Sequence, residues 1–336
     1  MTTAAIPGHK YIAELAANEY VDGVYAIQNA QLGQTKAGKP FLKCLLADKT
    51  GRTPGRMWSI DEGLFNTLPT DGFVWVAGQS QPYQGEVQII IQQVRPHEPT
   101  DAELAELLPS TKHDVDEMFA EVVRLLDSLQ SPGCQALASM YLSDGELMQA
   151  FCQAPAAREV HHAYLGGLLE HTLGLMRLAD AVCALYPDLS RDIVLLGLFL
   201  HDLGKTREMT WHKGLGYSAD GELVGHIARG VTMLHDKVNA LAADPHDPVV
   251  VPVELVRVLE HVLLSHHGVP EYGALKVPAT PEAILIHYLD NIDAKLNIAL
   301  TECRDADHLS NKAPGDFTEK IWALGTRLYR PDPAKA

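Results

Sequence analysis

The segment IVLLGLFLHD, residues 193–202, determines how the second half of this 336-residue chain folds. Eight apolar residues in succession indicate a helix that is buried on all sides, and His201 and Asp202 follow it directly. A buried carboxylate is costly unless it meets a cation, a hydrogen-bond donor or a metal ion. Because an isolated His-Asp pair is most often an ordinary hydrogen-bonded pair between helices, the flanking sequence has to distinguish that interpretation from a metal site.

Histidine is concentrated around this segment. Twelve of the sixteen histidines lie between His161 and His287. Strand signals are almost absent from this region, and long apolar helices are predicted over residues 168–186, 190–204, 224–241, 253–267 and 281–300. So many imidazoles among buried helices require an explanation beyond ordinary core histidines.

Further side chains of the metal-ligand type interrupt these helices. His171 lies on the helix before the His-Asp pair, His226 at a helix start, His266 and His267 at a helix end, and Asp290 within IHYLDNID. Their helices can therefore converge and turn these groups inward. Imidazole and carboxylate together suit Mn, Fe, Zn, Ni or Co rather than Ca or Mg alone. Six such groups are enough for two ions when one carboxylate bridges them.

The first hundred residues have a different pattern. Five stretches rich in β-branched and aromatic residues lie between residues 19 and 94, separated by turn sequences such as KAGKP and LPTDG. A helix-like LFNTL follows the third stretch. This arrangement predicts a small β-barrel of the OB type. The expected fold class is a multidomain protein with an N-terminal OB-type β-barrel followed by an all-α domain.

Helical periodicity begins after Thr100 and continues through residues 101–108, 114–129 and 134–151. The predicted domains are a nucleic-acid-binding barrel over 1–98, a helical connector over 99–160, and a metal domain over 161–336. One more helix is expected at the C-terminal end, in PGDFTEKIWALGTRLY, residues 314–329.

Charge is distributed unevenly along the chain. It carries 43 acidic and 27 basic side chains, a net charge of −16, which argues against indiscriminate coating of nucleic acid. Residues 31–60 are the exception, with six basic side chains against Asp48 alone. OB-folds hold single strands with such basic residues and interleaved aromatic rings, although a solvated face with Phe41 in the core would give the same composition. The candidate nucleic-acid contacts are Lys36, Lys39, Phe41, Lys43, Arg56 and Trp58.

The order H…HD…D, formed here by His171, His201-Asp202 and Asp290, resembles the HD-domain metal-dependent phosphohydrolases. By this resemblance, Asp202 would bridge a first ion, held by the H…HD…D residues, and a second ion held by two further histidines. The implied metal ligands are His171, His201, Asp202, His226, His266 and Asp290. The implied cofactors are two divalent transition-metal ions, with Mn²⁺ as first choice and Fe, Co, Ni or Zn as alternatives.

Several neighbouring residues have weaker assignments. His267 is the alternative to His266 as a ligand, and His162 is a candidate contact for the substrate phosphate or an alternative ligand. Lys205, in HDLGK, resembles the phosphate-facing lysine of HD-GYP domains and is, with Asp202, a candidate catalytic residue. Asp293 is expected either to orient a ligand or to form an ordinary helix salt bridge.

An OB-type barrel followed by a histidine-rich HD domain resembles the YhaM-type 3′–5′ exoribonuclease family. The resemblance covers nearly the whole chain, and its specific motifs are HHAYLGGLLEHT and LSHHG. It implies a metal-dependent phosphodiesterase that shortens single-stranded RNA from the 3′ end and releases 5′-mononucleotides, with single-stranded DNA left open as a substrate. Two alternatives are an HD phosphohydrolase of mononucleotides or cyclic dinucleotides with a regulatory OB domain, and a non-catalytic nucleic-acid-binding protein.

Location and partners follow from other features. No apolar run reaches the roughly 18–20 residues that cross a bilayer, and the N-terminal MTTAAIPGHK lacks the pattern of a signal peptide. Five scattered cysteines without a CxxC motif argue against a disulfide framework and a thiolate zinc site. We therefore expect a cytoplasmic protein with no membrane partner, and a homo-oligomer is left open.

Overall fold

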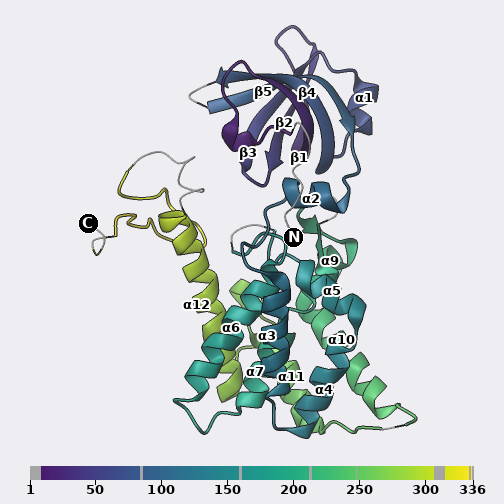
Figure 1. The fold of residues 1–336 in the computed structure, drawn as a ribbon, viewed down its shortest axis with the longest axis vertical. Helices are drawn as coiled ribbons and strands as arrows, with labels where there is room; N and C mark the ends of the chain where they lie inside the picture. Colours follow the sequence, from purple (N-terminus) through teal and green to yellow (C-terminus); the bar gives the residue numbers. More distant parts are fainter. Residues whose placement is uncertain are drawn as a thin grey trace. The chain divides into compact units, whose positions relative to one another are not determined.

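The computed structural model describes residues 9–83, 86–158, 161–211, 214–246, 248–305, 315–332 and 334. The chain divides into two compact units, and Figure 1 shows one of strands and one of helices. The first comprises Met1–Ser110 and Thr210–Gly216, and the second comprises Thr111–Met209 and Tyr217–Ala336.

The first unit contains a closed barrel whose strands follow the order β1-β2-β3-β5-β4. β3 and β5 pair in parallel, and the other pairs are antiparallel. A helix separates the third and fourth strands, as predicted, and the side chain of Asp61 caps its start. The OB-type barrel is thereby confirmed. Its elements are η1 (Ile12–Glu14), β1 (Tyr20–Gln34), β2 (Pro40–Asp48), β3 (Gly51–Trp58), α1 (Glu62–Thr67), β4 (Gly72–Tyr83), β5 (Glu86–Pro96) and α2 (Asp101–Leu107).

Alternation along β2 separates the inside of the barrel from its outside. Leu42, Cys44 and Leu46 are buried in the barrel core. Because successive side chains of a strand point to opposite faces, Phe41 and Lys43 lie on the outer face. Phe41 is therefore not a core residue, so the part of the alternative that placed it in the core is wrong.

The second unit is a bundle of helices around α7, which packs against α3, α4, α6, α11 and α12 (Figure 1). The predicted all-round burial of this helix is confirmed, because every residue from Val194 to Leu200 is buried. Gly197 brings α12 close, since a Cβ atom there would lie 2.8 Å from Cδ1 of Ile286. The helices are α3 (Val115–Asp127), α4 (Pro132–Leu142), α5 (Gly145–Gln153), α6 (Gly167–Cys183), α7 (Arg191–Leu200), α8 (Lys205–Glu208), α9 (Ala219–Leu223), α10 (Gly225–Ala242), α11 (Val253–Ser265) and α12 (Pro281–Arg304).

Three short elements remain. Two-residue strands β6 (Met209–Thr210) and β7 (Gly216–Tyr217) pair with each other, and a 3₁₀ turn, η2 (Pro270–Tyr272), follows α11. None of the helices in the described ranges combines the length and the apolar composition needed to span a membrane.

The predicted helix over 314–329 is wrong. Its described residues contain turns and two isolated bridges, Phe317 with Tyr329 and Ile321 with Thr326. The rings of Phe317 and Tyr329 lie 5.2 Å apart across this fold-back, so the apolar residues pair across a turn instead of lining a helix. Gly325 has a φ of 69°, a left-handed conformation that suits a turn and interrupts a helix.

The core around α7 predicts a large effect of removing Phe199. Its ring packs edge-on against Phe151 and Tyr141, with centroid distances of 5.7 and 6.1 Å. Phe199→Ala is expected to lower the free energy of unfolding by about 3–5 kcal/mol, because it leaves a cavity among these rings. Leu185→Ala, at a side chain that is 75% exposed, should change it by less than about 0.5 kcal/mol. Urea unfolding followed by circular dichroism measures both values, and equal effects would contradict the prediction.

Candidate metal centre

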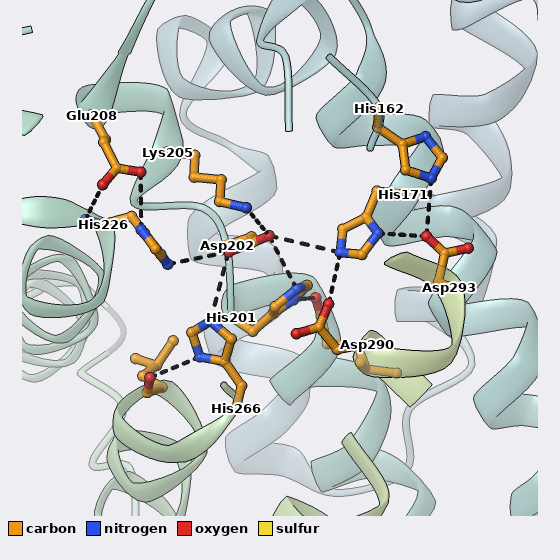
Figure 2. Close-up of polar contacts among 12 residues, drawn as sticks. His162, His171, His201, Asp202, Lys205, Glu208, His226, His266, Asp290 and Asp293 are labelled. Carbon is orange, nitrogen blue, oxygen red and sulfur yellow. Dashed lines mark hydrogen bonds and ion pairs between the residues drawn. The ribbon is translucent and has the colours of Figure 1, made fainter. Parts of the chain in front are cut away.

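Five helices or helix ends direct ligand-type side chains to one place in the bundle (Figure 2). His171 comes from α6, and His201 and Asp202 follow the end of α7. α10 contributes a residue at its start, α11 two residues at its end, and α12 one from its middle. The residues brought together are His171, His201, Asp202, His226, His266, His267 and Asp290.

These residues form two groups. One potential ligand atom from each of His171, His201 and Asp290 lies within 4.8 Å of the others. The second group, with the same spacing, consists of Asp202, His226, His266 and His267. Each group therefore offers imidazole and carboxylate ligands within the reach of a single ion.

Asp202 faces both groups with different oxygen atoms. Its Oδ2 lies 3.3 Å from Nε2 of His201 and 3.7 Å from Nε2 of His171. Its Oδ1 lies 3.5 Å from Nε2 of His226 and 3.7 Å from Nε2 of His266. A carboxylate placed in this way can bridge two ions, one on each oxygen.

A backbone contact holds two members of the second group, Asp202 and His226, near each other. Gly204, in the loop after Asp202, lies so close to the start of α10 that a Cβ atom would be 2.1 Å from the carbonyl oxygen of His226. Only glycine permits this approach. His226 and Asp202 are therefore held near each other by the main chain.

Two of the histidines are oriented by helix carbonyls. Nδ1 of His201 donates to the carbonyl oxygen of Leu198 at 2.6 Å, and Nδ1 of His266 donates to that of Leu263 at 2.8 Å. Both histidines are the C-cap residues of their helices, where carbonyl groups lack helical partners. The hydrogen bond fixes the tautomer, so that Nε2 carries the lone pair that a metal ion needs.

Two other histidines are oriented by carboxylates. Nδ1 of His171 lies 2.7 Å from Oδ2 of Asp293, and Nδ1 of His226 lies 2.9 Å from Oε2 of Glu208 (Figure 2). Asp293 thus has the orienting contact, which its position one turn after Asp290 had suggested. Glu208 was missed, because nothing in the sequence connects a residue of the KTRE segment with a histidine eighteen positions later.

The buried polar atoms of the site fit metal binding. Among the described residues, buried side-chain nitrogen and oxygen atoms are expected to have hydrogen-bond partners. Six atoms of this site have no such partner. They are Nε2 of His171, His201, His226 and His266, Nδ1 of His267, and Oδ1 of Asp202. Nitrogen donors with a carboxylate suit divalent transition metals.

The ionisation of the site also favours cations. Burial and the neighbouring imidazoles lower the pKa of His266 well below its ordinary value and that of His267 to about 4, so both are neutral, the form that binds metal. Burial acts to raise the pKa of Asp202, but the charge of Lys205 and the contact with His201 hold it well below its ordinary range. Asp202 is therefore an anion at neutral pH.

His171 is the exception among the ligand-type histidines. Burial acts to lower its pKa, but the carboxylates of Asp290, 3.3 Å from Nε2, and of Asp293, 2.7 Å from Nδ1, raise it to about 9. A proton on this imidazole therefore competes with a metal ion for Nε2.

Lys205 and His162 lie beside the two groups. Nζ of Lys205 donates to Oδ2 of Asp202 at 2.7 Å and is buried with it. His162 is also buried, with Nδ1 2.8 Å from the hydroxyl oxygen of Tyr164 and Nε2 2.9 Å from Oδ2 of Asp293. Both ring nitrogens of His162 are already engaged within the protein.

The outer face of the barrel gathers the other predicted contacts. Phe41 and Trp58 pair across β2 and β3 with ring centroids 5.3 Å apart, and Lys43 pairs with Arg56 in the same register. The Arg56 guanidinium lies 4.9 Å from the ring centroid of Tyr83, an exposed aromatic residue that the sequence reasoning missed.

A groove of about 360 Å³ lies on this face, lined in part by Lys43, Arg56 and Tyr83. Lys36 and Lys39 are exposed in the turn between β1 and β2. The structure therefore gathers most of the predicted basic and aromatic contacts on one surface of the barrel.

Comparison with known proteins relates both parts of the chain to characterised families. The HD domain family matches residues 168–295, from α6 into α12, and confirms the predicted HD domain. The 3′–5′ exoribonuclease YhaM of Geobacillus sp. (strain WCH70) is 33% identical over 325 residues, which cover 96% of this chain and 95% of that protein.

Two solved structures are also similar. The second OB-fold domain of replication protein A from Methanococcus maripaludis has 18% identity and a TM-score of 0.22, covering 27% of this chain and 97% of that one. The protein PriB from Ralstonia solanacearum has 15% identity and a TM-score of 0.20, covering 24% of this chain and all of that one.

The orienting carboxylates predict selective effects on the two groups. Glu208→Ala is expected to weaken Mn²⁺ binding at the His226 group about 10–100-fold, because it frees the His226 ring. Asp293→Ala should weaken binding at the His171 group by a similar factor. Glu260→Ala is the control, since Glu260 contacts His235 at 2.5 Å outside the centre. Equilibrium dialysis resolves the two affinities, and unchanged affinities in both variants would refute the orienting role.

Proposed function

Because the chain belongs to the YhaM family of 3′–5′ exoribonucleases, we propose that it is a metal-dependent exonuclease that shortens single-stranded RNA from its 3′ end and releases 5′-mononucleotides. The observation that carries the proposal is the convergence of two ligand groups on one carboxylate, Asp202. Single-stranded DNA is a second substrate to be tested.

The proposed ligands follow the two groups. His171, His201 and Asp290 would hold one ion together with Asp202, which would also contribute to the second. His226 and His266 complete the second site, and His267 is the alternative ligand in the same group. Two divalent ions, Mn²⁺ by preference and otherwise Fe, Co, Ni or Zn, would lower the pKa of a water molecule and neutralise the charge of the scissile phosphate.

Two buried side chains, Asp202 and Lys205, are proposed to position the substrate phosphate and to balance its charge. Asp202 faces both groups, and we propose that the scissile phosphate binds beside it. Lys205 places a buried ammonium group 2.7 Å from that carboxylate. We propose that this cation offsets the negative charge that the phosphoryl oxygens gain in the transition state.

The barrel is proposed to hold the substrate strand. Most of the chain is acidic, so its remaining surface repels polyanions, whereas the barrel face is basic and aromatic. Bases stack on Phe41 and Trp58, and Lys43 and Arg56 contact phosphates, with Lys36 and Lys39 extending the basic surface.

Cellular location and assembly complete the proposal. We place the protein in the cytoplasm, and its five unpaired cysteines support a reducing compartment. We also propose that it forms a homo-oligomer.

The polarity and the metal centre are tested together with 5′-labelled single-stranded RNA and Mn²⁺. The wild-type protein is expected to give a ladder of progressively shorter labelled products, because each cycle removes the 3′-terminal nucleotide. Asp202→Ala should bind less Mn²⁺ and lose all measurable hydrolysis, whereas Asp180→Ala, at a surface ion pair on α6, should behave like the wild type.

Immediate release of a labelled mononucleotide would contradict 3′ entry. Equal rates on cyclic dinucleotides or mononucleotides would favour the alternative phosphohydrolase. A folded Asp202→Ala protein with wild-type metal content and rate would exclude the binuclear centre.

The barrel face is tested by removing its aromatic rings. Phe41→Ala and Trp58→Ala are each expected to raise the Kd for single-stranded RNA roughly 5- to 150-fold, because each base–ring stack is worth about 1–3 kcal/mol. Tyr20→Ala, at an exposed aromatic residue of β1 outside this surface, is the matched control. Fluorescence anisotropy measures the Kd, and unchanged affinity in both variants would remove the barrel from substrate binding.

A further inference from the structure

The two consecutive histidines before α6 have different environments. Both ring nitrogens of His162 are engaged within the protein, Nδ1 with the hydroxyl group of Tyr164 and Nε2 with the carboxylate of Asp293. His161 is partly exposed, and neither of its ring nitrogens forms a hydrogen bond with another described residue. The sequence favoured His162 as a contact for the substrate, but it is the neighbouring His161 whose hydrogen-bonding groups are unused in the described structure.

The His161 ring lies beside the metal centre. Its centroid is 5.9 Å from that of His171, a member of the first ligand group. Burial and then the charge of Lys205 lower the pKa of His161 to about 4, and Asp290 acts to raise it, so both of these charged groups lie near the ring. No nitrogen atom of His161 belongs to the groups of potential metal ligands that the described residues form. His161 is therefore next to the centre without being one of its ligands.

A left-handed turn at His162 holds this ring in place. His162 has a φ of 48°, a conformation that few residues other than glycine adopt. Its carbonyl oxygen accepts hydrogen bonds from the main-chain nitrogens of Ala156 and Tyr164, at 3.1 and 2.9 Å. The start of α6 packs against the same oxygen, because a Cβ atom on Gly167 would lie 2.1 Å from it. Strained backbone that its surroundings fix in this way is concentrated at functional sites, and here it fixes the residue immediately before it, His161.

The part of the substrate next to the scissile phosphate is a ribose. In the proposed reaction the released 5′-mononucleotide keeps the scissile phosphate on its own ribose, so this sugar has to lie close to the metal centre. The proposed ions and Lys205 balance the charge of the phosphate, but they do not recognise the sugar. A neutral imidazole donates at one ring nitrogen and accepts at the other, which matches a hydroxyl group, because a hydroxyl group also donates and accepts.

We propose that His161 hydrogen-bonds the 3′-hydroxyl group of the terminal nucleotide and thereby selects strands with a free 3′ end. This inference rests on the proposed exonuclease function. The 3′-oxygen of every internal nucleotide is bonded to phosphorus and cannot donate a hydrogen bond, so only the last nucleotide offers a hydroxyl group there. Two ions alone would not distinguish internal from terminal phosphodiesters, because both present the same phosphate. His161 supplies the distinction.

Two short RNAs of the same sequence, one ending in a 3′-hydroxyl group and one in a 3′-deoxynucleotide, test this role with Mn²⁺ present. The wild-type protein is expected to release the last nucleotide of the hydroxyl-ended RNA with a kcat/KM on the order of 10-fold higher, because the deoxy end leaves the imidazole without a partner. His161→Ala should lose this preference and cleave both RNAs at the slower rate. His161→Asn keeps a donor and an acceptor and should restore part of the preference.

Binding of the product provides a readout that needs no hydrolysis. Isothermal titration calorimetry of the Mn²⁺-loaded protein compares adenosine 5′-monophosphate with its 3′-deoxy analogue. The wild type should bind the hydroxyl form with a Kd on the order of 10-fold lower, and His161→Ala should bind both nucleotides equally. Elemental analysis and thermal melting should find the Mn²⁺ content and the Tm of His161→Ala unchanged, since His161 is not a ligand. His235→Ala, at an ion pair with Glu260 outside the centre, is the matched control and should keep the preference.

Equal rates and equal affinities for the hydroxyl and deoxy forms in the wild type would overturn the proposal, as would a preference that persists in His161→Ala. A requirement for the 2′-hydroxyl group instead would also overturn it, because internal nucleotides carry that group too. Loss of Mn²⁺ from both His161 variants would assign the residue to the metal centre and not to the substrate. A wild-type protein that does not shorten RNA would refute the proposed function, and the calorimetric comparison would still decide the role of His161.

Discussion

The interaction on which the helical unit depends is the burial of one ionised carboxylate, Asp202. A charge in this position is tolerated only if cations or donors surround it. The chain meets this demand with the ammonium of Lys205 one turn away and with imidazoles from four helices. The arrangement of α6, α7, α10 and α11 around a single point follows from that electrostatic requirement as much as from apolar packing.

Helix ends make this arrangement rigid. His201 and His266 are C-cap residues, so one ring nitrogen satisfies a terminal carbonyl group and the other points into the centre. At both positions a single hydrogen bond therefore caps the helix and orients the ring. His171 lies inside a helix and His226 at a helix start, so neither is next to a free terminal carbonyl group. Carboxylates from elsewhere in the chain orient these two rings instead.

Structural features that follow a regular apolar pattern, or that interrupt one, could be predicted from the sequence. Alternation predicted the five strands, apolar periodicity predicted the buried helix α7, and polar interruptions predicted which histidines converge. Contacts between residues far apart in the chain left no such trace, which is why Glu208 and Tyr83 were missed. The expected C-terminal helix failed for a related reason, because the spacing of Phe317 and Tyr329 is satisfied equally by a pairing across a turn.

The distribution of the ligands along the chain has a thermodynamic consequence. The first and last of them, His171 and Asp290, are separated by most of the HD domain, and each comes from a different helix. An unfolded chain does not hold them together, so ions would bind the native state and not the unfolded chain, and would stabilise the fold. At a free ion concentration one hundred times the Kd, each bound ion would then add about 2.7 kcal/mol to the free energy of unfolding. The ions that serve hydrolysis would thus also hold the bundle together, and metal depletion would make the protein easier for proteases to degrade.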